Sequence, residues 1–189
     1  MHSTKSSAVK NPLLVIGITI FLGLFLSTSS FAKTAKEIDT NVNAALDRFR
    51  TEVKGADEFL KSAKGMLVLP GVIKGGFVVG GEYGEGALRI KGKTVDYYSI
   101  ASASYGFQLG GQKKDVILIF MQEEALQKFR ESSGWKAGVD GSVALVNLGA
   151  AASIDTAKIN EPIVGFVFSQ KGLMYNLTLE GSKFTKLKR

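Results

Sequence analysis

The chain has 189 residues, a formal net charge of +7, no cysteine and a single histidine, His2. Without cysteine it forms no disulfide. With one histidine it lacks the side chains that build zinc sites with nitrogen and sulfur ligands or activate serine and cysteine nucleophiles. We therefore predict no metal, no cofactor and no histidine-based catalysis.

Residues 1–32 are predicted to be a secretory signal peptide. Basic residues precede an unbroken apolar run over residues 13–26, which is followed by a small-x-small cleavage site ending at Ala32. At ~1.5 Å per residue the run reaches about 21 Å, short of the roughly 30 Å hydrocarbon core of a bilayer, so an uncleaved anchor is the less favoured alternative. We expect an exported protein, periplasmic or secreted, whose mature chain begins at Lys33 and contains no histidine.

Residues 33–64 are predicted to be helical. Apolar residues recur at steps of three and four from Ile38 to Leu60, and Gly55 is expected to divide the stretch into two helices. We expect the apolar stripe to cover the protein core, with membrane binding as the alternative. One later helix is predicted near residues 122–131, because acidic residues open it and basic residues close it, as the helix dipole favours.

From residue 65 onward the apolar period changes to two, which is typical of strands. The segments are rich in Val, Ile, Phe and Tyr, and turns are expected at Lys91-Gly92-Lys93 and at Gln170-Lys171-Gly172. Glycines inside strands usually mark bends or close approach of neighbouring strands. We predict a single α+β domain over residues 33–189, in which N-terminal amphipathic helices pack on a strongly curved, glycine-rich, mainly antiparallel sheet or half-barrel.

The stretch GVIKGGFVVGGEYGEG at residues 71–86 resembles a phosphate-binding loop at first sight. The continuation GEGALRIKGKT fails the P-loop pattern, since five residues rather than four separate Gly86 from Gly92 and the Lys-Thr pair opens no helix. We interpret the glycines as positions where strands bend and approach closely.

Glu82 and Glu85 are candidates for a catalytic carboxylate pair. Residues three apart on a strand face opposite sides, so the two acids would flank a bond only if the backbone turned at Gly84. We expect one solvated acid and one ion-paired or capping acid. A carboxylate-dependent hydrolase is the least favoured hypothesis.

Basic residues gather around the predicted strand turns. Positive charge beside apolar segments attracts anionic lipid at about 1 kcal/mol per basic residue near the surface, whereas the alternative is an ordinary solvated face. Nucleic acid is not expected as a partner, because no aromatic RNA-binding pair of strands is present. The candidate lipid-binding residues are Lys64, Lys74, Arg89, Lys91, Lys93, Lys113 and Lys114.

Four blocks of the sequence, in order, resemble the SYLF lipid-binding domain family. The first is AKGMLVLPGVIKGGFVVGGEYGEGAL at residues 63–88, and the others span residues 98–129, 135–155 and 169–184. Eukaryotic members bind phosphoinositides and associate with actin, and bacterial members resemble free-standing exported proteins presumed to bind phospholipid. The resemblance implies a non-enzymatic lipid-binding role. It also implies that the matching glycines define the fold: Gly65, Gly76, Gly80, Gly81, Gly84, Gly86 and Gly181.

We therefore predict a non-enzymatic phospholipid-binding module of the bacterial cell envelope, which associates peripherally with anionic lipid through basic turns. Lys64 and Lys74 match the family pattern and are the positions most expected to contact headgroups. The alternative is a structural envelope protein, including a small outer-membrane barrel, although a helical N-terminal segment is unusual for a barrel. The headgroup, any protein partner and the oligomeric state are not predicted.

Overall fold

The computed structural model describes residues 33–76, 79–105, 110–147, 160–172 and 178–189, without the side chains of residues 105 and 147. The predicted signal peptide lies outside these ranges. Residues Lys33–Arg189 form one compact unit. Within the described ranges, no helix combines the length and the apolar composition that a bilayer crossing requires.

Two helices open this unit. Helix α2 spans Ala35–Glu52 and helix α3 spans Ala56–Ser62. Thr34 begins α2 with a capping box, because its hydroxyl accepts the Glu37 N–H and the Glu37 carboxylate accepts the Thr34 N–H. Gly55 lies between the two helices with φ 89°, a conformation that glycine adopts at little cost, so the predicted break is confirmed.

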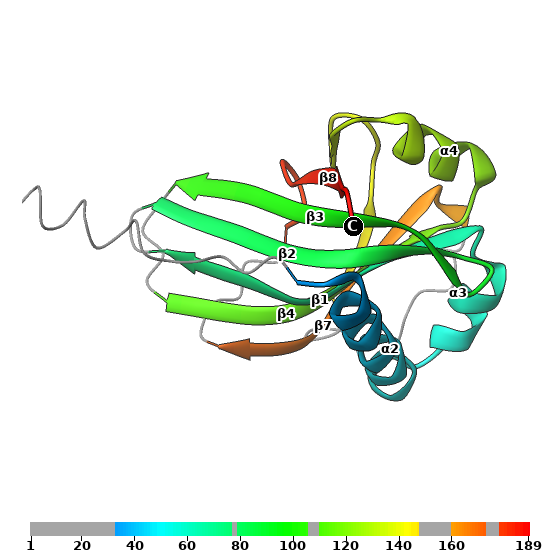
Figure 1. Cartoon of the computed structure of the whole chain (residues 1–189), viewed down its shortest axis with the longest axis horizontal. Helices are drawn as coiled ribbons and strands as arrows, with labels where there is room; N and C mark the ends of the chain where they lie inside the picture. Colours follow the sequence, from blue (N-terminus) through cyan, green and yellow to red (C-terminus); the bar gives the residue numbers. More distant parts are fainter. Residues whose placement is uncertain (1–32, 77–78, 106–109, 148–159, 173–177) are drawn as a thin grey trace, which may run out of the picture. The chain divides into compact units, whose positions relative to one another are not determined.

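The rest of the described chain consists of strands and one further helix, α4 (Glu123–Glu131), at the predicted position. The strands are β1 (Gly65–Gly76), β2 (Val79–Ile90), β3 (Lys93–Tyr105), β4 (Gly110–Phe120), β5 (Trp135–Lys136), β6 (Ala144–Asn147), β7 (Ile163–Gly172) and β8 (Lys183–Leu187). They form one sheet in the order β5-β8-β3-β2-β1-β4-β7-β6, and the described pairs are antiparallel except β6 with β7. The sheet curls strongly into a half-barrel, which confirms the predicted fold class (Figure 1).

One of the two predicted turns is present. Lys91 and Gly92, with φ values of 50° and 77°, form the two-residue hairpin turn between β2 and β3. The turn expected at Gln170-Lys171-Gly172 is wrong, because β7 continues through Gly172 and pairs with β4 there. A bulge at Ser169, which has φ 51°, allows this strand to continue where the local sequence suggested a reversal.

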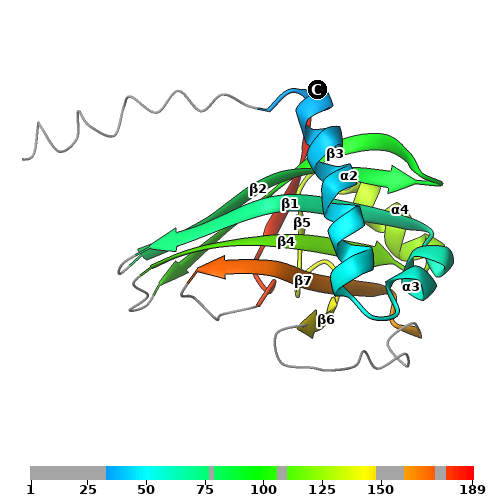
Figure 2. The same ribbon diagram turned by 90° about the horizontal axis from the view of Figure 1, so that it is seen from below.

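The sheet separates two hydrophobic clusters. Helices α2 and α3 cover one face, the α2 face, where Phe49 and Phe59 each pack edge-on against Phe166 of β7. Helix α4 covers the other face, the α4 face, where Phe129 packs against Trp135. Figure 2 shows α2 crossing the strands on its own face.

The strands shift register along a line across the sheet, which we call the bend line. β1 shifts against β2 between Val68 and Ile73, and Gly71, with φ 63°, lies inside this bulge. β4 and β7 shift beside Ser169. At Gly86 a side chain would collide with the backbone oxygen of Val68, so β1 and β2 approach at a distance that only glycine permits. The glycine-rich stretch therefore forms bent, closely paired strands.

Beyond the bend line, strands β3, β2, β1, β4 and β7 extend past the helices (Figures 1 and 2). We call this part the distal end of the sheet. It comprises residues 72–76, 79–84, 101–105, 110–114 and 170–172. The opposite end, where β1 begins and the Lys91–Gly92 turn lies, is the proximal end.

Candidate functional site

A row of exposed side chains crosses the α2 face of the distal end. Strand register places Ala101 of β3, Tyr83 of β2, Ile73 of β1, Lys113 of β4 and Lys171 of β7 side by side. Directly opposed residues share one face of a sheet. Ile73 is 62% exposed and Tyr83 is 51% exposed, and both lysines are also exposed. An apolar stretch therefore adjoins two positive charges on a surface that α2 leaves uncovered.

The surface beside this row is smooth and apolar. Gly75 pairs with both Gly81 and Gly111, which gives a strip without side chains across three strands. Val79, which lies on the same face of β2, is 66% exposed. We define the distal patch as Ile73, Val79, Tyr83, Lys113 and Lys171.

Two carboxylates flank the distal patch on the α2 face, and both are neutralised. Glu85 accepts hydrogen bonds from the Tyr83 hydroxyl at 2.7 Å and from the Arg189 guanidinium at 2.9 Å. Asp115 forms an ion pair with Arg48 of α2 at 2.7 Å. Desolvation and the hydrogen bond to Glu85 raise the pKa of Tyr83 to about 12, so the Tyr83 hydroxyl stays neutral at physiological pH. Neither carboxylate therefore presents an unpaired negative charge to the patch.

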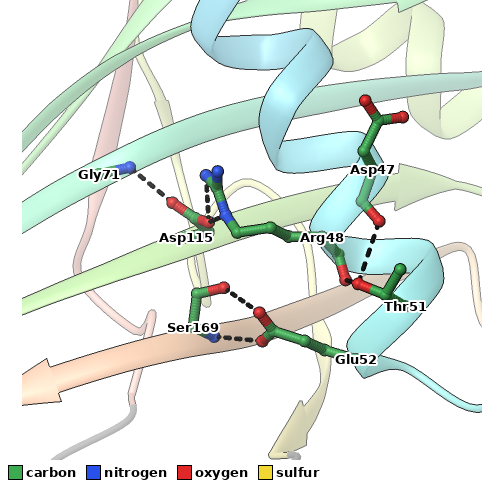
Figure 3. A network of polar contacts seen from close by, with 7 residues as sticks. All are labelled: Asp47, Arg48, Thr51, Glu52, Gly71, Asp115 and Ser169. Atoms are coloured by element: carbon green, nitrogen blue, oxygen red, sulfur yellow. Dashed lines mark hydrogen bonds and ion pairs between the residues drawn. The ribbon is translucent and has the colours of Figure 1, made fainter.

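Helix α2 is attached to the sheet at the bend line, as Figure 3 shows. Asp115 accepts from the Arg48 side chain and, through its other oxygen, from the Gly71 N–H at 2.7 Å. Glu52 accepts from the Ser169 N–H at 3.1 Å and from the Ser169 hydroxyl at 2.7 Å. Gly71 and Ser169 belong to the two bulges, so these contacts fix the line from which the distal end projects.

The α4 face of the distal end carries a buried polar row. Register aligns Ser102, Glu82, Lys74 and Gln112 across β3, β2, β1 and β4, and Lys114 lies two residues further along β4. Lys74 and Glu82 are each 4% exposed, and Lys114 is 1% exposed. The Lys114 ammonium lies 3.0 Å from a Glu82 oxygen. Charged side chains are thus buried where apolar ones are exposed on the opposite face, the reverse of an ordinary half-solvated sheet.

The predicted basic residues lie in two separate places. Lys64, Arg89, Lys91 and Lys93 are at the proximal end, whereas Lys74, Lys113 and Lys114 are at the distal end. The ten-residue separation of Lys64 from Lys74 corresponds to about 33 Å along a strand. The predicted residues therefore do not form one basic surface.

Lys74 and Lys114 are not at turns, contrary to prediction. β1 and β4 both continue past them, and the alternation of the strands directs the two side chains to the buried α4 face. Lys64, Lys91, Lys93 and Lys113 are exposed. Whether any of them contacts lipid remains a prediction.

Arg89 forms an ion pair with Asp39 of α2. Its guanidinium lies 3.4 Å from the Asp39 carboxylate, which also accepts hydrogen bonds from Thr94 at 2.6 Å and Tyr97 at 2.9 Å. Burial alone would raise the pKa of Asp39, but these hydrogen bonds and the Arg89 charge hold it below the ordinary value. Arg89 therefore anchors the beginning of α2 on the sheet.

Glu82 and Glu85 face opposite sides of β2, as strand geometry predicts. Both are buried, at 4% and 5% exposure, and both are ion-paired, so the expectation of one solvated acid is wrong. Lys114 contacts Glu82, and the Tyr83 hydroxyl and the Arg189 guanidinium contact Glu85, so both acids are bonded to protein groups in place of water. In the part of the chain that the structure describes, Asp and Glu side chains nowhere gather in a group of three that would hold a metal ion.

Sequence reasoning missed most of the distal patch. The sequence predicts Val79 and Tyr83 as strand residues and Lys171 as part of a turn, and it assigns Ile73 no role. The signal was available in part, because Ile73 alternates with Lys74 and Tyr83 alternates with Glu82 along adjacent strands.

Comparison with known proteins finds a family model that matches the C-terminal 89 residues of the chain. The family model named Ysc84, described as "Las17-binding protein actin regulator", matches residues 101–189. Residues 101–189 are therefore similar to the Ysc84, or SYLF, family. The resemblance noted in the sequence is thereby confirmed over a part that includes Lys113 and Lys171. The family description refers to binding and names no catalytic activity.

Several proteins similar to this chain are named SH3 domain-containing YSC84-like protein 1. The Xenopus laevis protein is 30% identical over 128 residues, which cover 65% of this chain and 38% of the relative. The Pongo abelii and human proteins are 29% and 28% identical, each with 65% of this chain and 37% of the relative covered. The chain thus spans well under half the length of these relatives.

Proposed function

We propose that this SYLF-like domain binds the surface of anionic phospholipid membranes through the distal patch. The observation that supports this function best is the exposed row in which Tyr83 and Ile73 adjoin Lys113 and Lys171. Apolar side chains enter the interfacial region of a bilayer, and each lysine near an anionic surface adds about 1 kcal/mol of attraction. The role is non-enzymatic.

The distribution of exposed apolar side chains favours the distal patch over the basic turns. Among the described residues, five large apolar side chains are exposed, and three of these belong to the patch. The proximal lysines Lys91 and Lys93 have Val95 as their exposed apolar neighbour on β3. Charge alone is present at both ends, but charge combined with a contiguous apolar surface is a feature of the distal end.

The compartment is part of the same proposal. Residues 1–32 carry the pattern of a cleaved signal peptide, which supports export to the periplasm or the exterior. There the domain would associate peripherally with the envelope membrane, as its uncovered sheet face rather than a membrane-spanning helix supplies the contact.

Vesicle flotation tests this function. The purified protein is expected to float with vesicles of phosphatidylglycerol and phosphatidylcholine at low salt, and to remain unbound to phosphatidylcholine alone or at high salt. The Lys113→Gln/Lys171→Gln variant is expected to lose about 2 kcal/mol of binding free energy, or roughly 30-fold in affinity. An Ile73→Ser/Tyr83→Ser variant should also bind more weakly.

The matched control is Lys91→Gln/Lys93→Gln, which removes the same charge at the proximal end and should bind like the wild type. The proposal is wrong if the wild type does not bind anionic vesicles at low salt. It is also wrong if the control loses as much affinity as the distal variant.

A further inference from the structure

A cavity of about 580 Å³ lies on the α4 face, between the segment that follows β5 and the segment that precedes β8. Its apolar wall consists of Ala137, Val143, Leu145 and Leu179, which belong to the hydrophobic cluster of this face or pack against it. The volume lies within the range of roughly 300–1,000 Å³ that is usual for small-molecule sites in proteins. The α4 face therefore has room for a small ligand beside its core.

Three of the apolar side chains converge over Gly165 of β7. A methyl group on Gly165 would lie 2.7 Å from Val143 Cγ1. It would also lie 3.3 Å from methyl carbons of Leu145 and Leu179. Leu145 is held there by the pairing of β6 with β7, in which it lies opposite Gly165. The missing side chain of Gly165 thus lets residues from distant parts of the chain pack on the sheet as one apolar wall.

Backbone hydrogen bonds fix the two segments that enclose the cavity. The Ala137 N–H donates to the Ser182 carbonyl at 3.1 Å, and the Ala137 carbonyl accepts from the Gly181 N–H at 3.0 Å. The Gly138 N–H donates to the Gly141 carbonyl at 2.9 Å and closes a turn at the rim. The cavity is therefore formed before a ligand arrives, which reduces the entropy that binding costs.

The rim of the cavity is polar and carries one negative charge. Ser142, Thr178 and Glu180 line the cavity and are exposed, and among its described lining residues Glu180 is the single charged one. The Glu180 N–H donates to the Thr178 hydroxyl at 3.1 Å. Within the part of the chain that the structure describes, the Glu180 carboxylate has no hydrogen bond or ion pair. This carboxylate is therefore available to a ligand.

We propose that this cavity binds a small cationic amphiphile, which is a molecule with an apolar body and an ammonium group. The apolar body lies against Val143, Leu145 and Leu179, and the ammonium donates to the Glu180 carboxylate at the rim. Charge-assisted hydrogen bonds of this kind are stronger than those between neutral groups. The same carboxylate repels phosphate and other anions, so the cavity selects against the headgroups that the distal patch attracts.

The cavity is separate from the distal patch. The patch belongs to the α2 face, whereas the cavity adjoins the hydrophobic cluster of the α4 face. Glu180→Gln is therefore expected to bind anionic vesicles like the wild type. Lys113→Gln/Lys171→Gln is expected to bind a cationic amphiphile like the wild type, so the two proposals can fail separately.

Titration with three probes of similar shape, followed by nuclear magnetic resonance at neutral pH, tests the site. Phenylbutylamine, phenylbutanol and phenylbutyrate share an apolar body and carry a cation, a neutral hydroxyl and an anion at its end. The amine is expected to bind about tenfold more tightly than the carboxylate, with the alcohol between them, because attraction and repulsion at an exposed carboxylate each change affinity by a few fold.

Two variants and a control locate the binding. Glu180→Gln is expected to reduce the preference for the amine over the carboxylate to about twofold, because the amide carries no charge. The matched control is Glu58→Gln, which removes an exposed carboxylate from α3 on the opposite face and should keep the full preference. Ser142→Trp, at an exposed rim position, should occupy the cavity and weaken the binding of all three probes.

Tightest binding of the amine, with loss of the preference in Glu180→Gln and weaker binding to Ser142→Trp, supports the proposal. The proposal is overturned if no probe binds, or if the amine is not the tightest of the three. It is also overturned if Glu180→Gln keeps the preference of the wild type, or if Ser142→Trp binds the probes as well as the wild type does.

Discussion

At the scale of single residues, the ion pair between Glu82 and Lys114 has both partners inside the protein. Their side chains are 1% and 0% exposed, so each charge relies on the other in place of water. The contribution of such a pair to stability becomes apparent when one partner is removed, because the remaining charge is then buried without compensation. The pair therefore has a second role besides stability. It requires that Glu82 and Lys114 face the interior together.

Glu82→Gln is expected to lower the free energy of unfolding by about 3–5 kcal/mol, because it leaves the buried Lys114 ammonium without its carboxylate. Glu82→Leu/Lys114→Met, which removes both partners, should lower it by much less. Urea unfolding followed by the fluorescence of Trp135, the single tryptophan and 2% exposed, measures both values. A double variant less stable than Glu82→Gln would contradict this interpretation.

At the scale of elements, the close approach of β1 and β2 depends on Gly86. A methyl group at this position would meet the backbone of Val68 and Leu69, and backbone atoms cannot rotate away as a side chain can. The neighbouring Gly81 differs, since its nearest contact would be the Ser102 carbonyl oxygen at 3.9 Å, an ordinary van der Waals distance. Position 86 therefore requires glycine, whereas position 81 of the same strand has room for a methyl group.

Gly86→Ala is expected to lower the free energy of unfolding by about 3 kcal/mol, since the two strands must separate or shift. Gly81→Ala, the control on the same strand, should change it by less than about 1 kcal/mol. Thermal or urea unfolding of the two variants compares them directly. Equal effects would mean that strand packing at the bend line is looser than the structure indicates.

Local signals in the sequence were enough to predict several elements. The break at Gly55, the hairpin turn at Lys91 and helix α4 each depend on a few consecutive residues, whose propensities decide the outcome. The apparent turn at 170–172 failed, because pairing with β4 more than fifty residues away allows β7 to continue.

The candidate site was harder to predict for the same reason. Each lysine was visible in the sequence, but its exposure depends on which face α2 and α4 cover and on where those helices end. The row from Tyr83 to Lys171 exists only once four strands have adopted their register. Alternation gives the two faces of a strand, and tertiary packing decides which of them is buried.

At the scale of the whole domain, the two ends of the sheet offer a direct comparison. Val79 at the distal end and Val95 near the proximal end are both exposed valines, at 66% and 41%. The chain contains no cysteine, so a single introduced thiol can be labelled at either position without interference.

An environment-sensitive fluorophore on Val79→Cys is expected to shift to shorter wavelength when anionic vesicles are added, because the distal patch enters the interface. The same label on Val95→Cys should not respond, and the emission of Trp135 should stay constant, because the core does not rearrange. A response from the label at position 95 alone would assign the contact to the proximal end and the basic turns.

At the distal end, charged side chains are buried on the α4 face and apolar side chains are exposed on the α2 face, and this arrangement affects folding. A slip of one residue in the pairing of β1 with its neighbours would turn Lys74 to the solvent and Ile73 to the interior, an exchange that the hydrophobic effect alone would favour. The distal end is therefore locally frustrated, and its register must be imposed by the pairing on the other side of the bulges. We infer that these strands pair first in the helix-covered half and then outward, and that the last segment to form is the one that carries the distal patch.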